Sequence, residues 1–355
     1  MGTSRVSCRR PSWLPSRRSS TASASKDFLQ ELRARSRATP RRLVFSEGTD
    51  ARVLAAAAAA VNTSLFVPIL LGKEDEVREE LDVLGLADRA LTVLDPNDPE
   101  RLSRLSQALH QLRGHRGVTL EEAHHFVEDP LLQAALMVGL GEADGSVSGC
   151  VRTTGEVIRA GLWGVGVAHA ITTVSSSFYM VLPSGHGRAH DVLTFTDAGV
   201  VPDPTPSQLA EIAVAAVRAR ERIVGDEPRV AFLSYSTLGS ADGPSVERVR
   251  EAVAIFRSLL PGVTAEGELQ ADAALSPEVA LTKAPSSALA GDANILVFPD
   301  LNSANIAYKL VQHLGGVRAL GPILQGLRKP CNDLSRGASI EDILLVGCIT
   351  ALMAD

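Results

Sequence analysis

The feature that most constrains this fold is the alternation of short apolar runs with longer helical patterns along the chain. The apolar runs are brief and are bounded by glycine or polar residues, which favours buried strands. They lie at 42–45, 65–71, 174–182, 192–196, 230–234 and 294–297. The helical patterns lie near 50–60, 74–83, 97–112, 119–126, 129–139, 207–224 and 244–259. This alternation predicts an α/β fold with mostly parallel sheets covered on both faces and divided into two packed lobes.

The charge distribution separates a basic leader from an acidic body. The chain has 355 residues, with 35 Lys and Arg, 41 Asp and Glu, and a net charge of -6. Residues 1–26 hold six of the bases and no acid, which leaves 29 bases against 41 acids in the remainder. An acidic body is a poor candidate for nucleic-acid binding, and no uncharged apolar run reaches the roughly 18 residues of a membrane span. We therefore expect no nucleic-acid partner and no membrane segment.

The leader at 1–26 is rich in arginine and serine, a composition that resembles an organellar transit peptide. The alternative is a disordered N-terminal extension. The four cysteines are widely scattered, which indicates a reducing compartment. We expect a cytoplasmic protein, or one of the mitochondrial or plastid matrix if the leader is a transit peptide.

Two features of the sequence resemble metal-binding or nucleophile motifs. His186 and His190 have the i,i+4 spacing of a zinc-binding helix, but a proline and two glycines between 183 and 187 favour a loop. Cys150 and Cys331 lie near motif-like stretches, where a small packing residue is commoner than a nucleophile. We expect no metal site.

The densest group of polar and glycine residues lies between Gly321 and Ile343. Its loop carries five charged or polar side chains, which are Lys329, Asn332, Asp333, Ser335 and Arg336. A helix is expected to begin near Ser339, so backbone N–H groups, a hydroxyl and a guanidinium would meet at a helix N-terminus. That combination favours a site for phosphate or another oxyanion. The alternative is structural, because Ser339-x-x-Asp342 also has the pattern of a capping box.

Several stretches of the chain resemble the phosphate acetyltransferase and phosphate butyryltransferase family. They lie at 201–212, 234–240, 267–270, 272–274, 298–302, 305–309, 321–327 and 332–337. The resemblance runs from about residue 28 to the C-terminus. The region of Asn302 and the Asp-Leu-Ser-Arg-Gly segment at 333–337 are more similar to the acetyl branch than to the butyryl branch.

The resemblance implies two α/β/α lobes with an active-site cleft between them, an architecture like that of isocitrate and isopropylmalate dehydrogenases. It implies that residues 27–170 and 322–355 form the first lobe and that residues 171–321 form the second. It also implies a homodimer that transfers acetyl reversibly between acetyl phosphate and coenzyme A. Coenzyme A (or acetyl-CoA) and acetyl phosphate (or phosphate) are then substrates, and no cofactor is expected.

The resemblance also implies roles for residues at matching positions. Asp342 matches the general base that takes the thiol proton of coenzyme A. Ser335 matches the residue that steadies the transition state or the leaving phosphate, and Arg336 matches the phosphate-binding arginine. Arg159 matches an active-site arginine, and Arg113 matches an arginine that contacts coenzyme A. We expect Arg113, Arg159 and Arg336 to converge in the cleft.

The segment from Ser148 to Thr154 matches a loop on the phosphate side of the family's site. Both of these residues are therefore candidate substrate-binding residues. The family usually has histidine where this chain has Arg152, and this departure bears on the contacts of the loop rather than on the fold.

Three alternatives to a phosphate acetyltransferase remain open at this point. The first is a phosphate butyryltransferase, which has the same chemistry with a larger acyl pocket. The second is a non-catalytic acyl-CoA-sensing module, although Ser335, Arg336 and Asp342 are all present. The third is a dehydrogenase of the isocitrate or isopropylmalate type, whose metal-binding aspartate cluster is not evident in the sequence.

Overall fold

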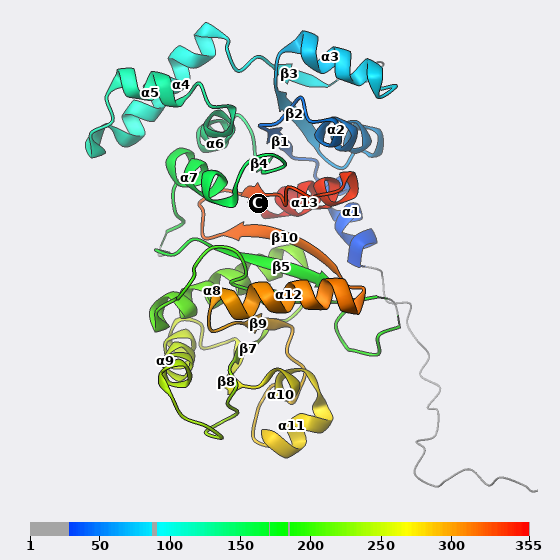
Figure 1. Ribbon diagram of the computed structural model, residues 1–355, viewed down its shortest axis with the longest axis vertical. Coiled ribbons are helices and arrows are strands. Elements are labelled where there is room, and N and C mark those ends of the chain that lie inside the picture. Colours follow the sequence, from blue (N-terminus) through cyan, green and yellow to red (C-terminus); the bar gives the residue numbers. More distant parts are fainter. Residues whose placement is uncertain (1–27, 87–90, 170, 184, 355) are drawn as a thin grey trace, which may run out of the picture.

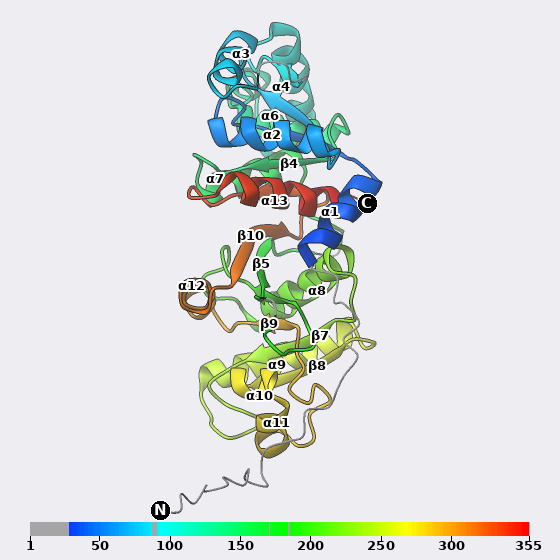
Figure 2. The ribbon, with the colours of Figure 1, turned by 90° about the vertical axis from the view of Figure 1, so that its right-hand side faces the viewer.

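The computed structural model describes residues 28–86, 91–169, 171–183 and 185–354. The basic leader at 1–26 lies outside these residues. The molecule is elongated, with two α/β lobes stacked along its long axis (Figure 1), and a quarter turn shows the same stacking (Figure 2). The predicted α/β architecture with mostly parallel sheets is confirmed.

The first lobe is built on a parallel sheet of five strands in the order β11-β4-β1-β2-β3. The strands are β1 (Arg42–Phe45), β2 (Val67–Leu71), β3 (Thr92–Leu94), β4 (Gly145–Ser148) and β11 (Cys331–Asp333). Successive residues of β1 face opposite sides, so Leu43 and Phe45 enter one hydrophobic cluster and Val44 enters another.

Helices cover both faces of this sheet. They are α1 (Phe28–Ala38), α2 (Ala51–Thr63), α3 (Glu74–Val83), α4 (Pro99–Arg113), α5 (Leu120–Phe126), α6 (Pro130–Leu140), α7 (Thr154–Gly164) and α13 (Ile340–Met353). α1, α2 and α13 pack together in the cluster of Leu43 and Phe45, whereas α6 and α7 pack in the cluster of Val44.

The second lobe is built on a sheet of six strands in the order β10-β5-β6-β9-β7-β8. The strands are β5 (Ser175–Val181), β6 (Val192–Thr196), β7 (Arg229–Leu233), β8 (Thr264–Leu269), β9 (Ile295–Val297) and β10 (Arg318–Gln325). β6, β9, β7 and β8 are parallel, whereas β5 is antiparallel to both of its neighbours.

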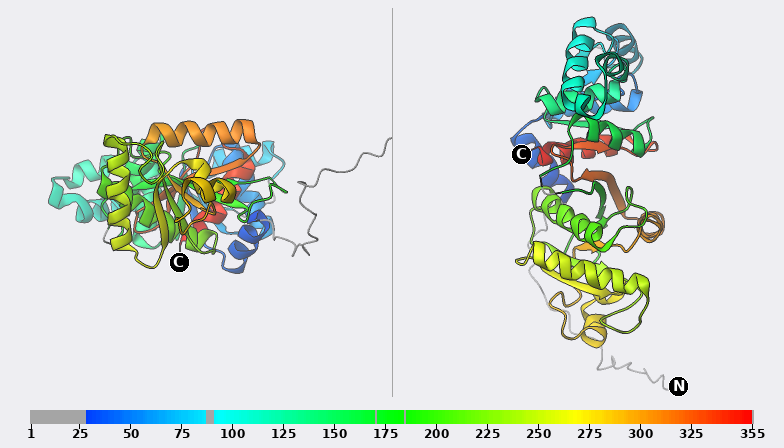
Figure 3. Two further views of the ribbon diagram at one scale, coloured as in Figure 1. Left: turned by 90° about the horizontal axis from the view of Figure 1, so that it is seen from below. Right: turned by 90° about the vertical axis from the view of Figure 1, so that its left-hand side faces the viewer.

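Five helices belong to this lobe. They are α8 (Pro206–Ile223), α9 (Pro244–Leu259), α10 (Ala271–Leu275), α11 (Pro277–Lys283) and α12 (Leu301–Gly315). α8 and α12 both contact β5 and β10, and they lie on opposite sides of the sheet, as Figure 2 and the right-hand view of Figure 3 show.

α13 joins the two lobes. It contacts α1, α2, β1 and β4 of the first lobe as well as α8 and β10 of the second. Its sequence is apolar almost all round, as expected for a helix with neighbours on every side. The same hydrophobic cluster therefore contains Phe45 of the first lobe and Tyr179 and Leu320 of the second. The start of α13 is thereby fixed at the boundary between the lobes.

The structure corrects the prediction at two strands. Residues 329–336 were expected to form a loop, but β11 runs through this segment, and its parallel neighbour β4 was not among the expected strands. Both strands are short, and both contain polar residues that are nonetheless buried, so hydrophobic periodicity could not reveal them. His186 and His190 lie in a loop, as predicted. Among the described residues, no helix is long and apolar enough to cross a bilayer.

Candidate active site

Three loops of the first lobe meet at the edge of the sheet where β1, β4 and β11 end. These strands are neighbours and run in the same direction, so their carboxyl ends lie side by side. The loops that follow them cover residues 46–50, 149–153 and 334–339. In α/β folds, ligands bind outside the carboxyl ends of parallel strands, which makes this edge the expected position of a site.

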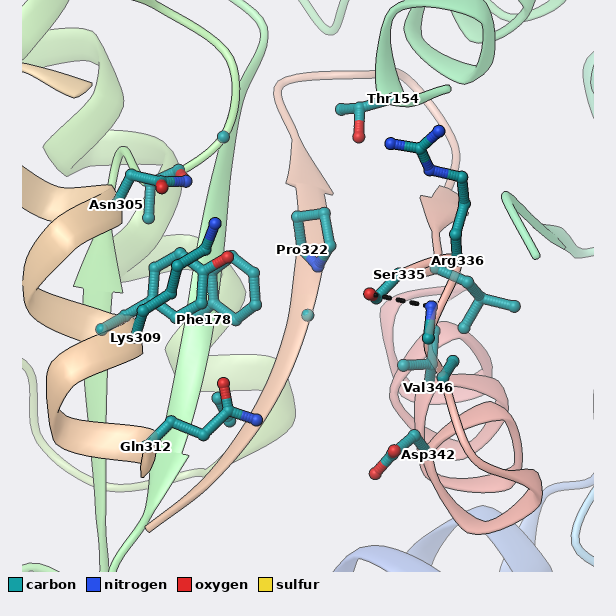
Figure 4. A pocket seen from close by; sticks show the side chains of 18 of the residues that line it. Thr154, Phe178, Asn305, Lys309, Gln312, Pro322, Ser335, Arg336, Asp342 and Val346 are labelled. Atoms are coloured by element: carbon teal, nitrogen blue, oxygen red, sulfur yellow. Dashed lines mark hydrogen bonds between the residues drawn. The ribbon is translucent and has the colours of Figure 1, made fainter. Parts of the chain in front are cut away.

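A cavity of about 550 Å³ lies between this edge and the second lobe. Two opposed walls line it, and Figure 4 shows members of both. The residues that we call the α13 wall are Arg152, Thr154, Ser335, Arg336, Asp342 and Val346. The residues that we call the α12 wall are Phe178, Asn305, Tyr308, Lys309 and Gln312. The site is thus a cleft between lobes, to which each lobe contributes polar groups.

Asp342 occupies the third position of α13, where it also caps the helix. Its Oδ2 atom accepts hydrogen bonds from the Ser339 hydroxyl (2.7 Å) and from the Ser339 backbone N–H (3.1 Å), and the Ser339 hydroxyl accepts from the Asp342 N–H. The predicted capping box is confirmed. Within the described part of the chain, Oδ1 has no hydrogen-bond partner, so the carboxylate keeps one oxygen available to the cavity.

Ser335 and Arg336 stand on the exposed loop that leads into α13. The Ser335 hydroxyl accepts a bond of 3.3 Å from the Gly337 N–H. The Arg336 guanidinium extends toward Thr154 (Figure 4), and it pairs with no carboxylate among the described residues. A hydroxyl, a free guanidinium and the N-terminus of a 14-residue helix thus line one side of the cavity, and each of them favours an anion.

The buried carboxyl group of Asp333 holds the Thr154 side chain by a hydrogen bond. The Thr154 hydroxyl donates to Asp333 Oδ2 at 2.6 Å, while Asp333 Oδ1 is buried without a hydrogen-bond partner in the described structure. Burial raises the pKa of Asp333 to about 7, and the nearby Glu47 carboxylate adds to the rise. Gly149 lies directly against this group, because a Cβ at Gly149 would come within 2.2 Å of Asp333 Oδ1.

None of the site residues predicted from the sequence belongs to the α12 wall. Lys309 is exposed, and its ammonium lies 5.8 Å from the centre of the Tyr308 ring, which in turn stacks on Phe178 at 4.0 Å. Gln312 follows one turn later, and the Asn305 amide donates to the Ala198 carbonyl. The segment 305–309 resembles the family in sequence, but only its placement across from Arg336 reveals it as a wall of the cavity.

Arg159 lines a second cavity of about 500 Å³, formed by α5, α6 and α7. Its apolar part includes Trp163, whose ring meets that of Phe126 edge to face. Arg152 lines both cavities, so the two are adjacent. The Arg152 guanidinium pairs with Asp129 (2.8 Å) and with Glu156 (3.1 Å), so its charge is largely compensated.

Two of the predicted residues line neither cavity. Arg113 lies over the ring of Trp163 and donates to the carbonyl groups of Leu162 and Trp163, and burial together with Arg116 and Arg328 lowers its pKa. Ser148 is buried in β4.

Arg113, Arg159 and Arg336, which were expected to converge in the cleft, do not line one cavity in this structure, because Arg336 lines the first, Arg159 the second and Arg113 neither. The three residues lie on α4, α7 and the loop before α13, and sequence spacing gives no distance between these elements.

The cysteines near the site are buried packing residues. Burial raises the pKa of Cys150 to about 12 and that of Cys331 to about 11, which makes both of them poor nucleophiles. In the part of the chain that the structure describes, no three His, Cys, Asp or Glu side chains are grouped to hold a metal ion.

Comparison with known proteins agrees with this architecture. The family model of phosphate acetyl/butaryl transferases matches residues 27–351. A phosphate acetyltransferase of Clostridium acetobutylicum is 40% identical over 328 residues, which cover 92% of this chain and 98% of the relative. One of Paracoccus denitrificans is 41% identical over 325 residues, which cover 91% and 98%. The crystal structure of a phosphotransacetylase from Streptococcus pyogenes gives a TM-score of 0.87 at 41% identity and covers 92% of this chain and 98% of that one.

Proposed function

The chain belongs to the phosphate acetyl/butaryl transferase family and functions as a phosphate acetyltransferase, and we propose that the thiolate of coenzyme A attacks acetyl phosphate directly in its cleft. The reaction converts acetyl phosphate and coenzyme A reversibly into acetyl-CoA and phosphate. One observation supports the assignment most strongly. Asp342, Ser335 and Arg336 line a single cavity at the start of α13.

We place the phosphoryl group of acetyl phosphate between the two walls. Arg336 approaches it from the α13 wall and Lys309 from the α12 wall, while the N-terminus of α13 adds its partial positive charge. A guanidinium neutralises phosphate well because it donates two parallel hydrogen bonds to the oxygens. This neutralisation makes phosphate a better leaving group when the thiolate attacks the carbonyl carbon.

Asp342 acts as the general base in this proposal. A free thiol has a pKa of about 8.5 and an aspartate one of about 3.9, so complete proton transfer in water would cost about 6 kcal/mol. Asp342 therefore assists only as the thiol begins to attack, which is worth about 10²–10⁴-fold in rate. Arg336 points toward Thr154, so it supports the phosphate while Asp342 supports the thiol (Figure 4).

Coenzyme A is long enough to occupy more than the first cavity. We place its thiol beside Asp342 and its remaining length toward the second cavity, where Arg159 offers a cation and Trp163 an aromatic face. Arg152 stands where the two cavities adjoin. In this arrangement Arg113 acts indirectly, because its guanidinium lies over the Trp163 ring and supports that side chain. Coenzyme A is a substrate, and the proposed chemistry uses no cofactor.

We propose that the protein is a homodimer in the cytoplasm. The outer face of α12 supports the dimer, because Ile306, Leu310 and Leu314 recur at helical spacing and are 58%, 53% and 83% exposed. Light scattering on wild-type protein and on Leu310→Glu would test the dimer. Mass spectrometry of the mature N-terminus from its native cell would test the compartment, because removal of residues 1–26 would indicate import into an organelle.

The activity is tested by mixing purified protein with coenzyme A and either acetyl phosphate or butyryl phosphate, and by following the absorbance of the thioester. We expect the higher kcat/KM with acetyl phosphate. A preference for butyryl phosphate would move the assignment to the butyryl branch. Coenzyme A binding without turnover would favour the acyl-CoA-sensing module, and NAD(P)-linked activity would favour a dehydrogenase.

A further inference from the structure

The first turn of α2 contains an arginine whose hydrogen-bonding capacity is fully used. Arg52 Nε and Nη2 donate to the two carboxylate oxygens of Asp50 at 3.1 and 2.8 Å. Nη1 donates to the carbonyls of Arg336 (2.9 Å) and Ala338 (3.2 Å), and Nη2 also donates to the carbonyl of Cys150 (3.2 Å). These five bonds match the five N–H donors of a guanidinium. Arg52 thereby connects two loops that are far apart in sequence.

Glu47, in the loop between β1 and α2, also holds the loop at 149–153. Its Oε2 atom accepts from the backbone N–H groups of Gly149 (3.0 Å) and Cys150 (2.8 Å). Its Oε1 atom accepts from those of Val151 (2.9 Å) and Arg152 (3.3 Å). Four successive amides that converge on one point form an anion-binding concavity, and here the protein's own carboxylate fills it.

The two loops that are held in this way carry most of the α13 wall. The loop at 334–339 presents Ser335 and Arg336, and the loop at 149–153 presents Arg152 and leads into Thr154. Cys150, Leu334 and Ala338 anchor the two loops in the hydrophobic core, whereas Ser335 and Arg336 are exposed. The backbone between the anchors is what the bonds from Arg52 and Glu47 hold in place. Neither Arg52 nor Glu47 lines the cavity between the walls.

We propose that Arg52 and Glu47 are positioning residues of the acetyl-transfer reaction. They fix the two loops relative to each other, so that the Arg336 guanidinium and the Thr154 hydroxyl approach the same phosphate. This inference rests on the proposed function. Its physical basis is that a displacement of about 1 Å at a reacting centre can cost about 10²-fold in rate.

The test is the replacement Arg52→Lys, which keeps the positive charge but has three donors in place of five and no planar fork. We expect KM for acetyl phosphate to rise at least about tenfold while KM for coenzyme A changes less than about threefold, because KM does not depend on the fraction of active protein. A loss of stability alone would not change the KM for acetyl phosphate while leaving the KM for coenzyme A nearly unaltered.

Arg229 offers a matched control in the second lobe. It also ties carbonyl groups together, through bonds to Asp292 (2.9 Å), Leu289 (2.8 Å) and Ala288 (3.2 Å), and its side chain is 21% exposed compared with 32% for Arg52. We expect Arg229→Lys to lower the melting temperature without changing either KM. If Arg52→Lys behaved like Arg229→Lys, the positioning role would be wrong.

Chemical rescue distinguishes activity lost through displaced loops from activity lost through misfolding. Because Arg52 is partly exposed, ethylguanidine added to Arg52→Ala should restore at least about a tenth of the wild-type kcat, and it should restore none with Arg336→Ala plus Arg52→Ala. Glu47→Gln, which keeps the shape but weakens the acceptor, should reproduce the selective effect on acetyl phosphate. The proposal would be overturned if ethylguanidine did not rescue Arg52→Ala and if Glu47→Gln left both KM values unchanged. Wild-type protein runs in the same assay, and inactivity of wild type would instead refute the proposed function.

Discussion

The two walls of the cleft differ in how firmly their polar groups are held. On the α13 wall, Asp342 is hydrogen-bonded to Ser339, and Arg52 and Glu47 tie the loop that carries Arg336 and the loop that leads into Thr154. On the α12 wall, Lys309 projects from the exposed side of one helix, and the contact that the described structure gives its ammonium is the ring of Tyr308. The difference indicates that chemistry needing fixed geometry is done on the α13 wall, whereas the α12 wall binds and covers the substrate.

The largest effect that this comparison predicts is that of Asp342→Asn. The amide is isosteric and can still accept from Ser339, but it cannot take a proton, so we expect kcat to fall about 10²–10⁴-fold. The control is Ser339→Ala, which removes the cap and keeps the carboxylate. It should cost about 1 kcal/mol of stability and little of the rate. Turnover of Asp342→Asn within threefold of wild type would refute the assignment of the base.

The second prediction concerns Arg336→Gln on the same wall. Loss of one preorganised charged donor at developing charge typically costs about 10²–10³-fold. We expect that loss in kcat/KM for acetyl phosphate, with KM for coenzyme A nearly unchanged. Arg257→Gln, which removes an exposed ion pair to Glu266 in the second lobe, is the control and should leave both constants unaltered. Equal effects on both substrates would mean that Arg336 is not specific to the phosphate.

The third prediction concerns Lys309→Gln on the α12 wall. Because this ammonium is exposed and lacks a fixed partner, we expect KM for acetyl phosphate to rise by at most about fivefold, with kcat within about twofold of wild type. The effect should shrink further as ionic strength rises. A fall in kcat as large as that of Arg336→Gln would erase the difference between the walls.

The smallest effect on rate is expected from Asp333→Asn, which instead changes the dependence of stability on pH. The folded-state pKa of Asp333 is raised to about 7 by burial, above the unfolded value of about 4. Its contribution to stability is therefore full below about pH 4 and is lost as the pH rises toward 7. Relative to Asp333→Asn, the wild type should lose more than about 1 kcal/mol of unfolding free energy across this range. Parallel stability curves for the two proteins would contradict the raised pKa.

Much of the α13 wall could be predicted from the sequence. The pattern at Ser339 and Asp342 specified the start and the cap of α13, since capping depends on residues three apart and on little else. The alternation of apolar runs was sufficient to predict the class of fold. Between 174 and 297, β5, β6, α8, β7, α9 and β9 were predicted for the same reason, whereas β8, α10 and α11 were not.

The remainder depended on contacts between distant segments. β4 and β11 are short and polar. They form strands because they pair with neighbours: β4 pairs with both β1 and β11, and β11 pairs with β4. The sequence could not place the three arginines relative to one another, because helix spacing sets no distance between α4, α7 and the loop before α13. The role of Arg52 could have been suspected, because a polar segment from Glu47 to Arg52 directly follows a buried parallel strand.

The central claim is direct transfer of acetyl from phosphate to the thiol without an acetyl-enzyme. The buried cysteines beside the cavity support it, and Ser335 is the side chain whose acylation would contradict it. The most direct test is to incubate the protein with acetyl phosphate and isotopically labelled phosphate in the absence of coenzyme A. The account predicts that no label enters acetyl phosphate until coenzyme A is added. Exchange in its absence would demonstrate a covalent acetyl intermediate and would contradict the account.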